Sequence, residues 1–284
     1  MKRTAIVVAM LGISAWGFGR SNDKAASQAP PAGQQAAPAA QGKRPPAAKT
    51  QPEYTAYQAV VAITDPAAQE KAADDFATKF PDSELRVVAY KSVMHAYQQS
   101  NSADKMLESA HKVLSLDADD PEALLGVSQV LAERTRETDL DKDQRLAEAK
   151  KDAERALVTV DTDVATAGQP QDRVDAYKGF LRSDAYAILG TIEFNNKAWA
   201  NAETDFRKSI DALPQNVDPI AVFRLSVALD MQDKIPEALK YANQAVDLTK
   251  AGTSAGDAAR AEKDRLTKRS GGAAAPAQTS APPK

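Results

Sequence analysis

The sequence contains no cysteine, which excludes disulfide bonds, thiolate metal sites and cysteine nucleophiles. Histidine is almost as scarce: His95 and His111 fall in two different helical segments, and neither has catalytic or metal-binding spacing around it. A glycine-rich phosphate loop is also missing. These absences leave little chemistry for catalysis, so we expect no cofactor and no enzyme. An enzyme is the remote alternative, and its active site would have to lack any recognisable local motif.

The chain also lacks an excess of positive charge. Its 284 residues carry a formal net charge of -3, whereas a nucleic-acid-binding domain usually shows a basic stripe for phosphates. We therefore expect no nucleic-acid partner. A hydrophobic content of 43% is enough for a sizeable core, but alanine and proline concentrate at both ends, so the folded part is shorter than the chain.

The first residues have the pattern of a secretory signal. Lys2 and Arg3 precede a short apolar run that ends in small residues at Gly19. We expect residues 1–19 to be a signal peptide and the chain to be exported to the bacterial periplasm or cell envelope. Arg20 stands where a lipoprotein would have its lipid-acceptor cysteine, so lipidation is excluded. An uncleaved N-terminal anchor or a cytoplasmic start is the alternative, and we expect membrane association through the N-terminus only.

Two segments are too poor in bulky apolar residues to fold. Residues 20–51 are rich in alanine, proline and glutamine, and residues 271–284 have a similar composition. Such segments cannot bury enough surface to offset their conformational entropy. We expect a disordered linker and a disordered tail on either side of a helical repeat domain, residues 52–270.

The clearest helical pattern lies between residues 186 and 214. Apolar and small residues repeat there with the spacing of two amphipathic helices joined by a short turn. The residues that we expect to pack the two helices are Tyr186, Leu189, Gly190, Ala202 and Phe206. A glycine inside a helix costs roughly 1 kcal/mol relative to alanine. Gly190 therefore predicts that another helix backbone comes close at this point.

The same pattern recurs along the chain. A small or flexible residue opens the packed face of each second helix, at Ala72, Met106, Ala149, Ala202 and Ala238, with gaps of 34, 43, 53 and 36 residues. Helix starts are marked independently by three Asp-Pro pairs, at residues 65–66, 120–121 and 218–219, where the aspartate can cap the helix. Residues 254–268 predict a terminal cap helix, with a basic face in solvent.

The order of aromatic residue, Leu-Gly, alanine, aromatic residue and closing proline in residues 186–214 resembles the tetratricopeptide repeat (TPR). The resemblance implies an all-α fold, a superhelical stack of about five helix-turn-helix repeats. It also implies a non-catalytic scaffold or adaptor that binds a protein or peptide partner in its concave groove. Residues 76–83 resemble helix endings of repeat lipoproteins involved in outer-membrane protein assembly and envelope maintenance. A structural component of an outer-membrane or cell-wall assembly complex is therefore the alternative function.

The resemblance places the first helix of each repeat on the concave side. The residues expected to line the groove are Tyr57, Lys91, His95, Gln98, Gln129, Thr191, Asn195 and Phe223. We expect Lys91, His95, Gln129 and Asn195 to face open space without supporting the fold. Residues 139–143 open like a calcium loop, but Gln144 replaces the required glycine and Lys150 the bidentate carboxylate, so we expect no metal.

Overall fold

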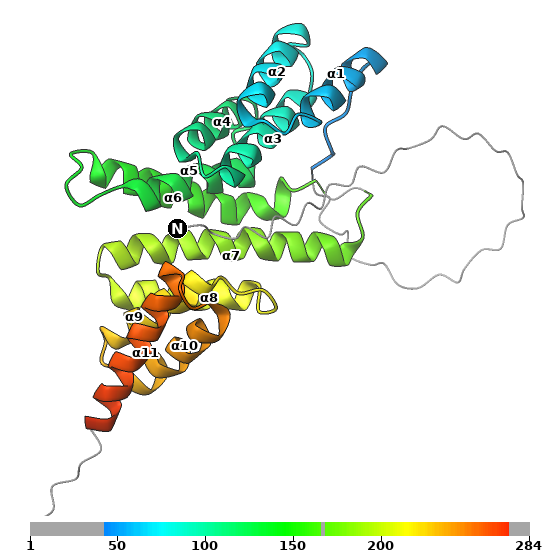
Figure 1. Cartoon of the computed structure of the whole chain (residues 1–284). Helices are drawn as coiled ribbons and strands as arrows, with labels where there is room; N and C mark the ends of the chain where they lie inside the picture. Colours follow the sequence, from blue (N-terminus) through cyan, green and yellow to red (C-terminus); the bar gives the residue numbers. More distant parts are fainter. Residues whose placement is uncertain (1–42, 166–167, 273–284) are drawn as a thin grey trace, which may run out of the picture.

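The computed structural model describes residues 43–165 and 168–272 (Figure 1). The predicted signal peptide, most of the predicted linker and nearly all of the predicted tail lie outside these residues. The described residues contain helices and no strand; the helices are α1 (Gln51–Val61), α2 (Pro66–Lys79), α3 (Leu85–Gln99), α4 (Ala103–Leu116), α5 (Pro121–Arg134), α6 (Lys142–Thr162), α7 (Gln171–Asn195), α8 (Trp199–Ala212), α9 (Pro219–Asp230), α10 (Ile235–Leu248) and α11 (Ser254–Gly272). Within this part of the chain, no helix combines the length and apolar character that crossing a membrane requires.

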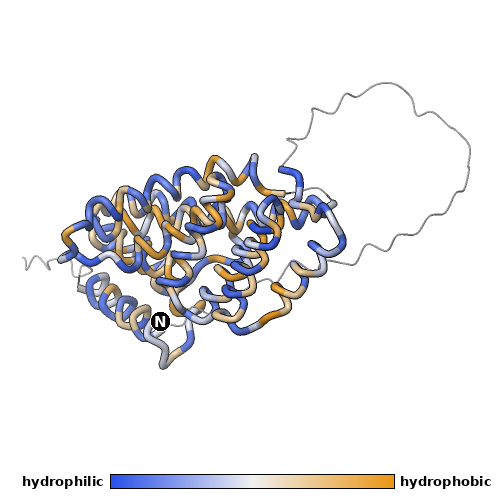
Figure 2. The backbone as a smooth tube through the Cα atoms, turned by 90° about the horizontal axis from the view of Figure 1, so that it is seen from above, coloured by the Kyte–Doolittle hydropathy of each residue, from blue (hydrophilic) through white to orange (hydrophobic). Residues whose placement is uncertain are grey.

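Consecutive helices form five hairpins. Helices α1 and α2 make repeat 1, and each following pair makes the next repeat, up to α9 and α10 in repeat 5. Each helix packs against the next one along the chain, and α11 closes the stack on α10 and α9 (Figure 1). Hydrophobic and hydrophilic residues alternate along the helices (Figure 2), as expected of amphipathic helices with one packed face. The predicted all-α stack of about five TPR-like repeats is confirmed.

The second helices share one register. Helices α2, α4, α8 and α10 each have 14 residues, and in each the fourth residue opens a buried face that continues four and seven positions later. The opening residues of α4, α8 and α10 are Met106, Ala202 and Ala238, as predicted. In α2 the opening residue is Gln69, which is 3% exposed, and not Ala72, which is only half-buried. The predicted register of repeat 1 was therefore wrong by one helical turn.

The sequence pattern did not identify Gln69 as the opening residue, because it is a polar residue at a position where the pattern expects an apolar one. Its side-chain amide donates hydrogen bonds to the carbonyl oxygen of Val60 (3.3 Å) and to Oγ of Ser92 (2.8 Å). These bonds satisfy the buried nitrogen, whereas Oε1 of the same amide is buried without a hydrogen bond among the described residues. The amide therefore links α2 to α1 within repeat 1 and to α3 of repeat 2.

The two long gaps in the repeat series become longer helices. Helix α6 has 21 residues and is extended at both ends of the common register, with Ala149 still fully buried. Helix α7 has 25 residues. The pair forms the long central layer of the molecule, with repeats 1 and 2 on one side and α8 to α11 on the other (Figure 1). The insertions thus lengthen one antiparallel contact without interrupting the stack.

Three of the turns inside repeats have the same backbone conformation. Asn101, Lys197 and Asp233 have φ angles of 57°, 59° and 61°, and each lies five positions before the opening residue of its second helix. The amide N–H of the following residue reaches back to the carbonyl of Tyr97, Glu193 or Leu229, at 2.9–3.0 Å. This is a helix C-terminus closed by one left-handed residue. The recurrence supports the register of repeats 2, 4 and 5.

The three Asp-Pro caps form as predicted. The carboxylates of Asp65, Asp120 and Asp218 each accept a hydrogen bond of 2.9 Å from a backbone N–H of the first turn of α2, α5 or α9. A fourth cap was not predicted: Thr50 and Glu53 form a capping box at the start of α1. Its sequence signature, threonine followed three residues later by glutamate, is present in the chain.

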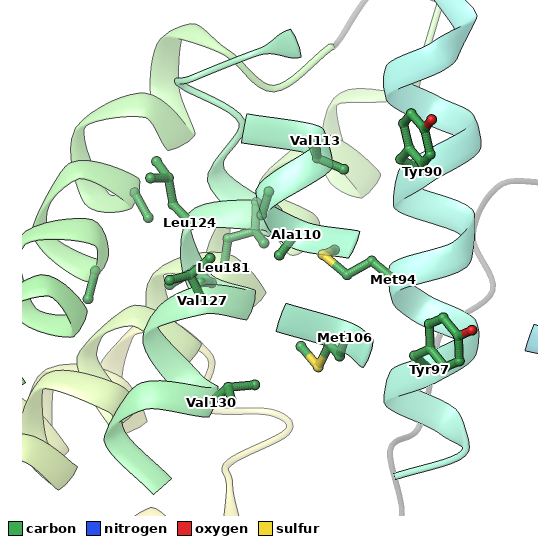
Figure 3. Close-up of a cluster of buried hydrophobic side chains, with 14 of the residues drawn as sticks. Tyr90, Met94, Tyr97, Met106, Ala110, Val113, Leu124, Val127, Val130 and Leu181 are labelled. Carbon is green, nitrogen blue, oxygen red and sulfur yellow. The ribbon is translucent and has the colours of Figure 1, made fainter. Parts of the chain in front are cut away.

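Inside repeat 4, the residues that face each other across α7 and α8 are matched in size. A Cβ atom placed on Gly190 would lie 2.7 Å from two ring atoms of Phe206, so the glycine makes room for an aromatic ring. The prediction that a helix backbone approaches Gly190 was wrong in this detail. At the equivalent positions repeat 2 has Met94 and Ala110, which lie in the cluster of Figure 3. One side of each contact is large and the other is small.

The terminal helix α11 is attached by both apolar and charged side chains. Ala259 and Leu266 are fully buried. Arg265 and Arg269 both pair with Asp230 of α9, whose side chain is 1% exposed. The predicted cap helix is confirmed, and these two arginines pair with a buried carboxylate while their side chains stay 47% and 41% exposed.

Repeat 2 has a large residue where repeat 4 has Gly190 and a small one where repeat 4 has Phe206. Size matching therefore predicts that repeat 4 tolerates Gly190→Met better when Phe206→Ala is made at the same time. We expect Gly190→Met to cost about 1–3 kcal/mol through overpacking and Phe206→Ala to cost about 3–5 kcal/mol through the cavity it leaves. The free energy of unfolding lost by the double variant should be smaller than the sum of the two single losses by about 0.5–3 kcal/mol. Urea unfolding of the four proteins measures this difference, and additive losses would show that the two residues do not share one space.

The left-handed turn predicts a specific tolerance at Lys197. A β-branched residue is strained at positive φ, whereas glycine is not. We expect Lys197→Val to be less stable than Lys197→Gly by about 1–2 kcal/mol in thermal unfolding. The neighbouring Asn196 has φ -81°, so Asn196→Val should show a smaller loss relative to Asn196→Gly. Equal differences at the two positions would contradict the turn assignment.

Candidate functional site

The first helices form the inner side of the stack. Helix α7 packs directly on α5 and on α9, which brings neighbouring repeats together on this side. We call the side chains of α3, α5, α7 and α9 that point away from the second helices the inner face. The predicted groove residues on these helices can be located against this surface.

At the N-terminal end of the inner face, charged groups from α3, α5 and α7 meet. Lys91 pairs with Asp120 (Nζ–Oδ2, 3.0 Å) and with Glu122. His95 Nε2 lies 2.8 Å from Oε2 of Glu122, and Tyr177 of α7 lies close enough to Glu122 for the two groups to interact. We call these five residues the Glu122 network. It joins the first helices of repeats 2, 3 and 4.

Burial and charge act against each other in this network. Burial by itself would raise the pKa of Glu122, but Lys91 and His95 outweigh it and hold the pKa below its usual value. Burial would lower the pKa of Lys91, and the carboxylates of Glu122 and Asp120 raise it instead. Burial, followed by the charge of Glu122, raises the pKa of Tyr177. Glu122 is therefore an ionised carboxylate shared by three helices.

The middle of the inner face is polar and shallow. Gln129, Glu133, Asp184 and Thr191 belong to the lining of a depression between α5 and α7, of about 10 Å³, room for one water molecule. Arg224 of α9 donates a 2.6 Å hydrogen bond to Oγ1 of Thr191, so this part of the surface continues into repeat 5.

Several predicted groove residues do support the fold. Lys91 and His95 belong to the Glu122 network, and the side-chain amide of Asn195 donates a 3.4 Å hydrogen bond to the carbonyl oxygen of Ala132 in α5. The expectation that these three support nothing was wrong, because neighbouring first helices come close enough for polar side chains to bridge them. Gln129 bonds within its own helix, to Glu133 at 3.4 Å. Gln98 is exposed.

Two aromatic groove residues do not lie on the open surface, and Thr191, also predicted to line the groove, is only 5% exposed. Tyr57 is 4% exposed, and its ring packs against Phe76. Phe223 is half-buried and packs against the core cluster that contains Val222 and Ala245. Both were misplaced because an aromatic residue beside the packed stripe of a helix can turn toward the core, where its large apolar area is removed from water.

The predicted packing residues are distributed as follows. Met106, Ala149, Leu189, Gly190, Ala202, Phe206 and Ala238 are buried, and Ala72 and Tyr186 are half-buried. The ring of Tyr186 has Lys208 Nζ 5.2 Å from its centroid. A half-buried aromatic residue under a cation is typical of the border of a core. Seven of the nine predicted packing residues are thus buried in the structure.

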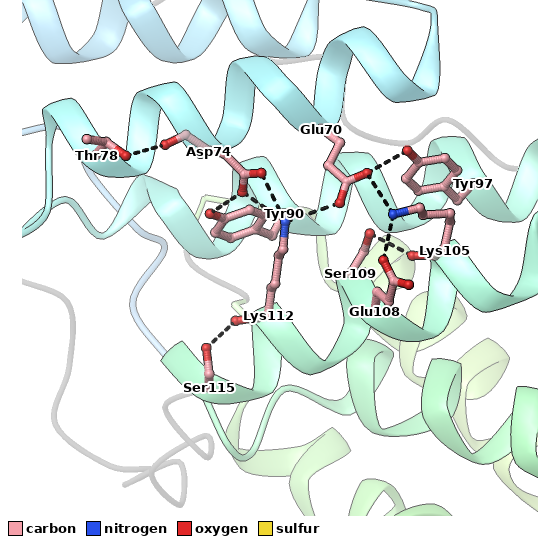
Figure 4. Close-up of polar contacts among 10 residues, drawn as sticks. All are labelled: Glu70, Asp74, Thr78, Tyr90, Tyr97, Lys105, Glu108, Ser109, Lys112 and Ser115. Carbon is pink, nitrogen blue, oxygen red and sulfur yellow. Dashed lines mark hydrogen bonds and ion pairs between the residues drawn. The ribbon is translucent and has the colours of Figure 1, made fainter.

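A second polar cluster lies between α2, α3 and α4 (Figure 4). The hydroxyls of Tyr90 and Tyr97 donate to Asp74 (2.9 Å) and Glu70 (2.7 Å). Lys112 reaches both carboxylates, at 2.9 and 3.2 Å. Burial, followed by the bond to Glu70, raises the pKa of Tyr97 to about 12. Every polar group here has a partner, so the cluster ties repeat 1 to repeat 2.

The described residues bring together no three groups of a type that could hold a metal ion. In the aspartate-rich loop before α6, the carboxylate of Asp139 accepts a 2.8 Å hydrogen bond from the backbone N–H of Arg136. That carboxylate shapes the turn at the end of α5.

No protein-family model and no curated protein matches the chain. Among solved structures, PilW, a widely conserved type IV pilus biogenesis factor, is 14% identical, with 73% of this chain and 98% of that chain covered and a TM-score of 0.39. The RpL4 assembly chaperone Acl4 is 11% identical, with coverages of 78% and 98% and a TM-score of 0.40. A tetratricopeptide repeat protein from Parabacteroides merdae is 14% identical, with coverages of 79% and 95% and a TM-score of 0.36.

The Glu122 network predicts an acid-sensitive contribution to stability. Because the folded-state pKa of Glu122 lies below its ordinary value, the contribution is complete above the unfolded pKa of about 4.3 and is lost as pH falls below it. We expect Glu122→Gln to lower the free energy of unfolding at pH 7 by about 1–3 kcal/mol.

The difference between wild type and Glu122→Gln should shrink as the pH is lowered from about 5 to 3. Thermal unfolding across this range measures it, with Glu148→Gln on the exposed face of α6 as the matched control. A difference that stays constant with pH would contradict the assigned protonation state.

Proposed function

We propose that this chain is a non-catalytic, TPR-like scaffold or adaptor of the bacterial envelope, and that it binds a protein or peptide partner along the inner face. The observation that carries the proposal is the composition of that face. Side chains from the first helices of four consecutive repeats contribute to it, and three amides and one carboxylate occupy its accessible points, at Gln98, Gln129, Asn195 and Glu133. Such groups can hydrogen-bond to the backbone of an extended polypeptide.

The shape of the surface favours a macromolecular partner. The depression on the inner face holds about 10 Å³, and another beside α6 and α7 holds about 170 Å³. Small-molecule sites usually enclose about 300–1,000 Å³. A polypeptide that crosses several repeats gains its contact area by length and needs no deep cavity. This supports an adaptor more than an enzyme.

The envelope part of the proposal rests on the sequence of residues 1–19, which predicts export. The alternative is a structural component of an outer-membrane or cell-wall assembly complex. The residues behind that alternative have structural contacts: the rings of Phe76 and Phe80 lie 5.2 Å apart, and Ser83 donates a 2.5 Å hydrogen bond to Glu53. These contacts give residues 76–83 a structural role at the end of repeat 1, which explains their pattern without an assembly function. The adaptor is therefore the better-supported proposal.

Partner recovery from envelope extracts tests the proposal. The bait is the full chain, compared with a Gln98→Arg, Gln129→Arg variant of the inner face and with a matched Gln99→Arg, Gln215→Arg variant at exposed positions elsewhere. We expect the inner-face variant to lose at least about tenfold of a specifically recovered protein, because interface energy concentrates in a few central contacts.

The matched variant should recover the partner like wild type, and circular dichroism should show unchanged helix content in both variants. Equal recovery by both variants would move partner binding away from the inner face.

A further inference from the structure

The described chain begins with an extended basic segment that lies on the folded domain. We call residues 43–49, Lys-Arg-Pro-Pro-Ala-Ala-Lys, the arm. It runs from α1 toward the end of α6 (Figure 1). Most of the sequence around it was predicted to be a linker, yet the arm makes specific contacts with residues from three different repeats.

The first anchor of the arm is Lys43. Its backbone N–H donates a 3.1 Å hydrogen bond to the carbonyl oxygen of Thr162 at the end of α6. Its ammonium group pairs with Asp117 (2.5 Å) after α4 and with Asp163 (3.5 Å) after α6. One lysine therefore touches two of the loops that join successive repeats.

The second and third anchors are Arg44 and Lys49. Arg44 pairs with Glu84 at 2.6 Å, and the other oxygen of that carboxylate accepts a 3.1 Å hydrogen bond from the backbone N–H of Ala47. Lys49 Nζ donates to the carbonyl oxygen of Asp82 at 2.7 Å. Both contacts lie in the loop between α2 and α3. The arm thus crosses the three loops that follow α2, α4 and α6.

These loops form an acidic edge that fits a basic segment. Glu84, Asp117 and Asp163 come from three different loops between repeats, and each faces a cation of the arm. Between the cations, Pro45 and Pro46 have no backbone N–H and favour an extended conformation. Charge and backbone shape are therefore complementary across a length that only an extended segment can span.

The arm is held in a way that permits exchange. The side chains of Lys43 and Arg44 are 41% and 67% exposed in their ion pairs, and exposed ion pairs contribute little and weaken with salt. Ala48 packs only partly against the core. The covalent link to α1 supplies an effective concentration on the order of millimolar, so weak contacts are enough to keep the site filled in cis.

We propose that the acidic edge, formed by the loops after α2, α4 and α6, is a second recognition surface for an extended, basic, proline-containing polypeptide segment. The arm of this chain occupies it in cis, and a partner segment of the same chemistry binds by displacing the arm. The contacts of the arm use none of the accessible inner-face residues named for partner binding, so this inference does not depend on the proposed function.

A peptide of residues 43–50 with a fluorescent label tests the proposal by anisotropy. The full-length Lys43→Glu, Arg44→Glu variant should bind the peptide at least tenfold more tightly than wild type, because its own arm no longer fits the edge. Binding should disappear in 0.5 M NaCl, with a charge-reversed peptide, and when Glu84→Gln and Asp117→Asn are added to the variant. A Lys151→Glu, Lys268→Glu variant has the same net charge change at exposed positions elsewhere and should behave like wild type.

A second measurement uses only the unmodified chain. Hydrogen exchange in residues 43–50 of wild type should rise when the unlabelled peptide is added at millimolar concentration, and should not change with the charge-reversed peptide. Peptide binding that is equal in wild type and the arm variant, or absent from both, would overturn the proposal. Exchange that is indifferent to the peptide would also overturn it, leaving the arm as a fixed strap.

Discussion

The structure depends on one constraint: the facing side chains of the two helices in each repeat must fill the space between them without a clash. Four second helices have the same length and bury side chains at the same three positions of their register. Where one helix brings a large side chain to the contact, the other brings a small one, as with Phe206 and Gly190. Close packing leaves no free volume for two large side chains. The stack can therefore continue in one direction with a regular offset.

Regular stacking explains why polar clusters recur between neighbouring repeats. The cluster of Figure 4 joins α2 to α3 and α4. A comparable one joins α8 to α10, where Arg207 donates to the hydroxyl of Tyr241 (2.9 Å) and Lys234 pairs with Glu203 (2.7 Å). On the opposite side, the Glu122 network joins α3, α5 and α7. The inner face is thus both the proposed binding surface and a set of contacts between repeats, so a partner there also touches groups that fix the angle between helices.

Much of the fold could be predicted because helix periodicity and Asp-Pro caps are local signals. The hairpins, four of the five opening residues and the cap helix follow from them. Gln69 could not be found in this way, because a buried amide in an apolar position depends on partners in two other helices. The sequence predicted which residues lie on the first helices, but it did not predict which side chains contact one another there. Lys91 gives no local sign that it meets Asp120 and Glu122, since that meeting depends on how closely the repeats stack.

The contacts of the arm could not be predicted from its composition either. Its prolines and alanines indicate a segment that cannot fold alone, and the segment indeed has no helix or strand. Its lysines and arginine find carboxylates that are separated by many residues in the sequence. Composition describes what a segment can do in isolation and does not show which surface is beside it.

The most direct test of this account compares leucine at two alanines of one helix. Ala202 is fully buried at the opening position of α8, whereas Ala200, in the same first turn, is exposed. Guanidinium unfolding should show that Ala202→Leu loses about 1–3 kcal/mol and that Ala200→Leu stays within about 0.5 kcal/mol of wild type. Equal free energies of unfolding for the two variants would contradict close packing between the two helices of a repeat at the opening position.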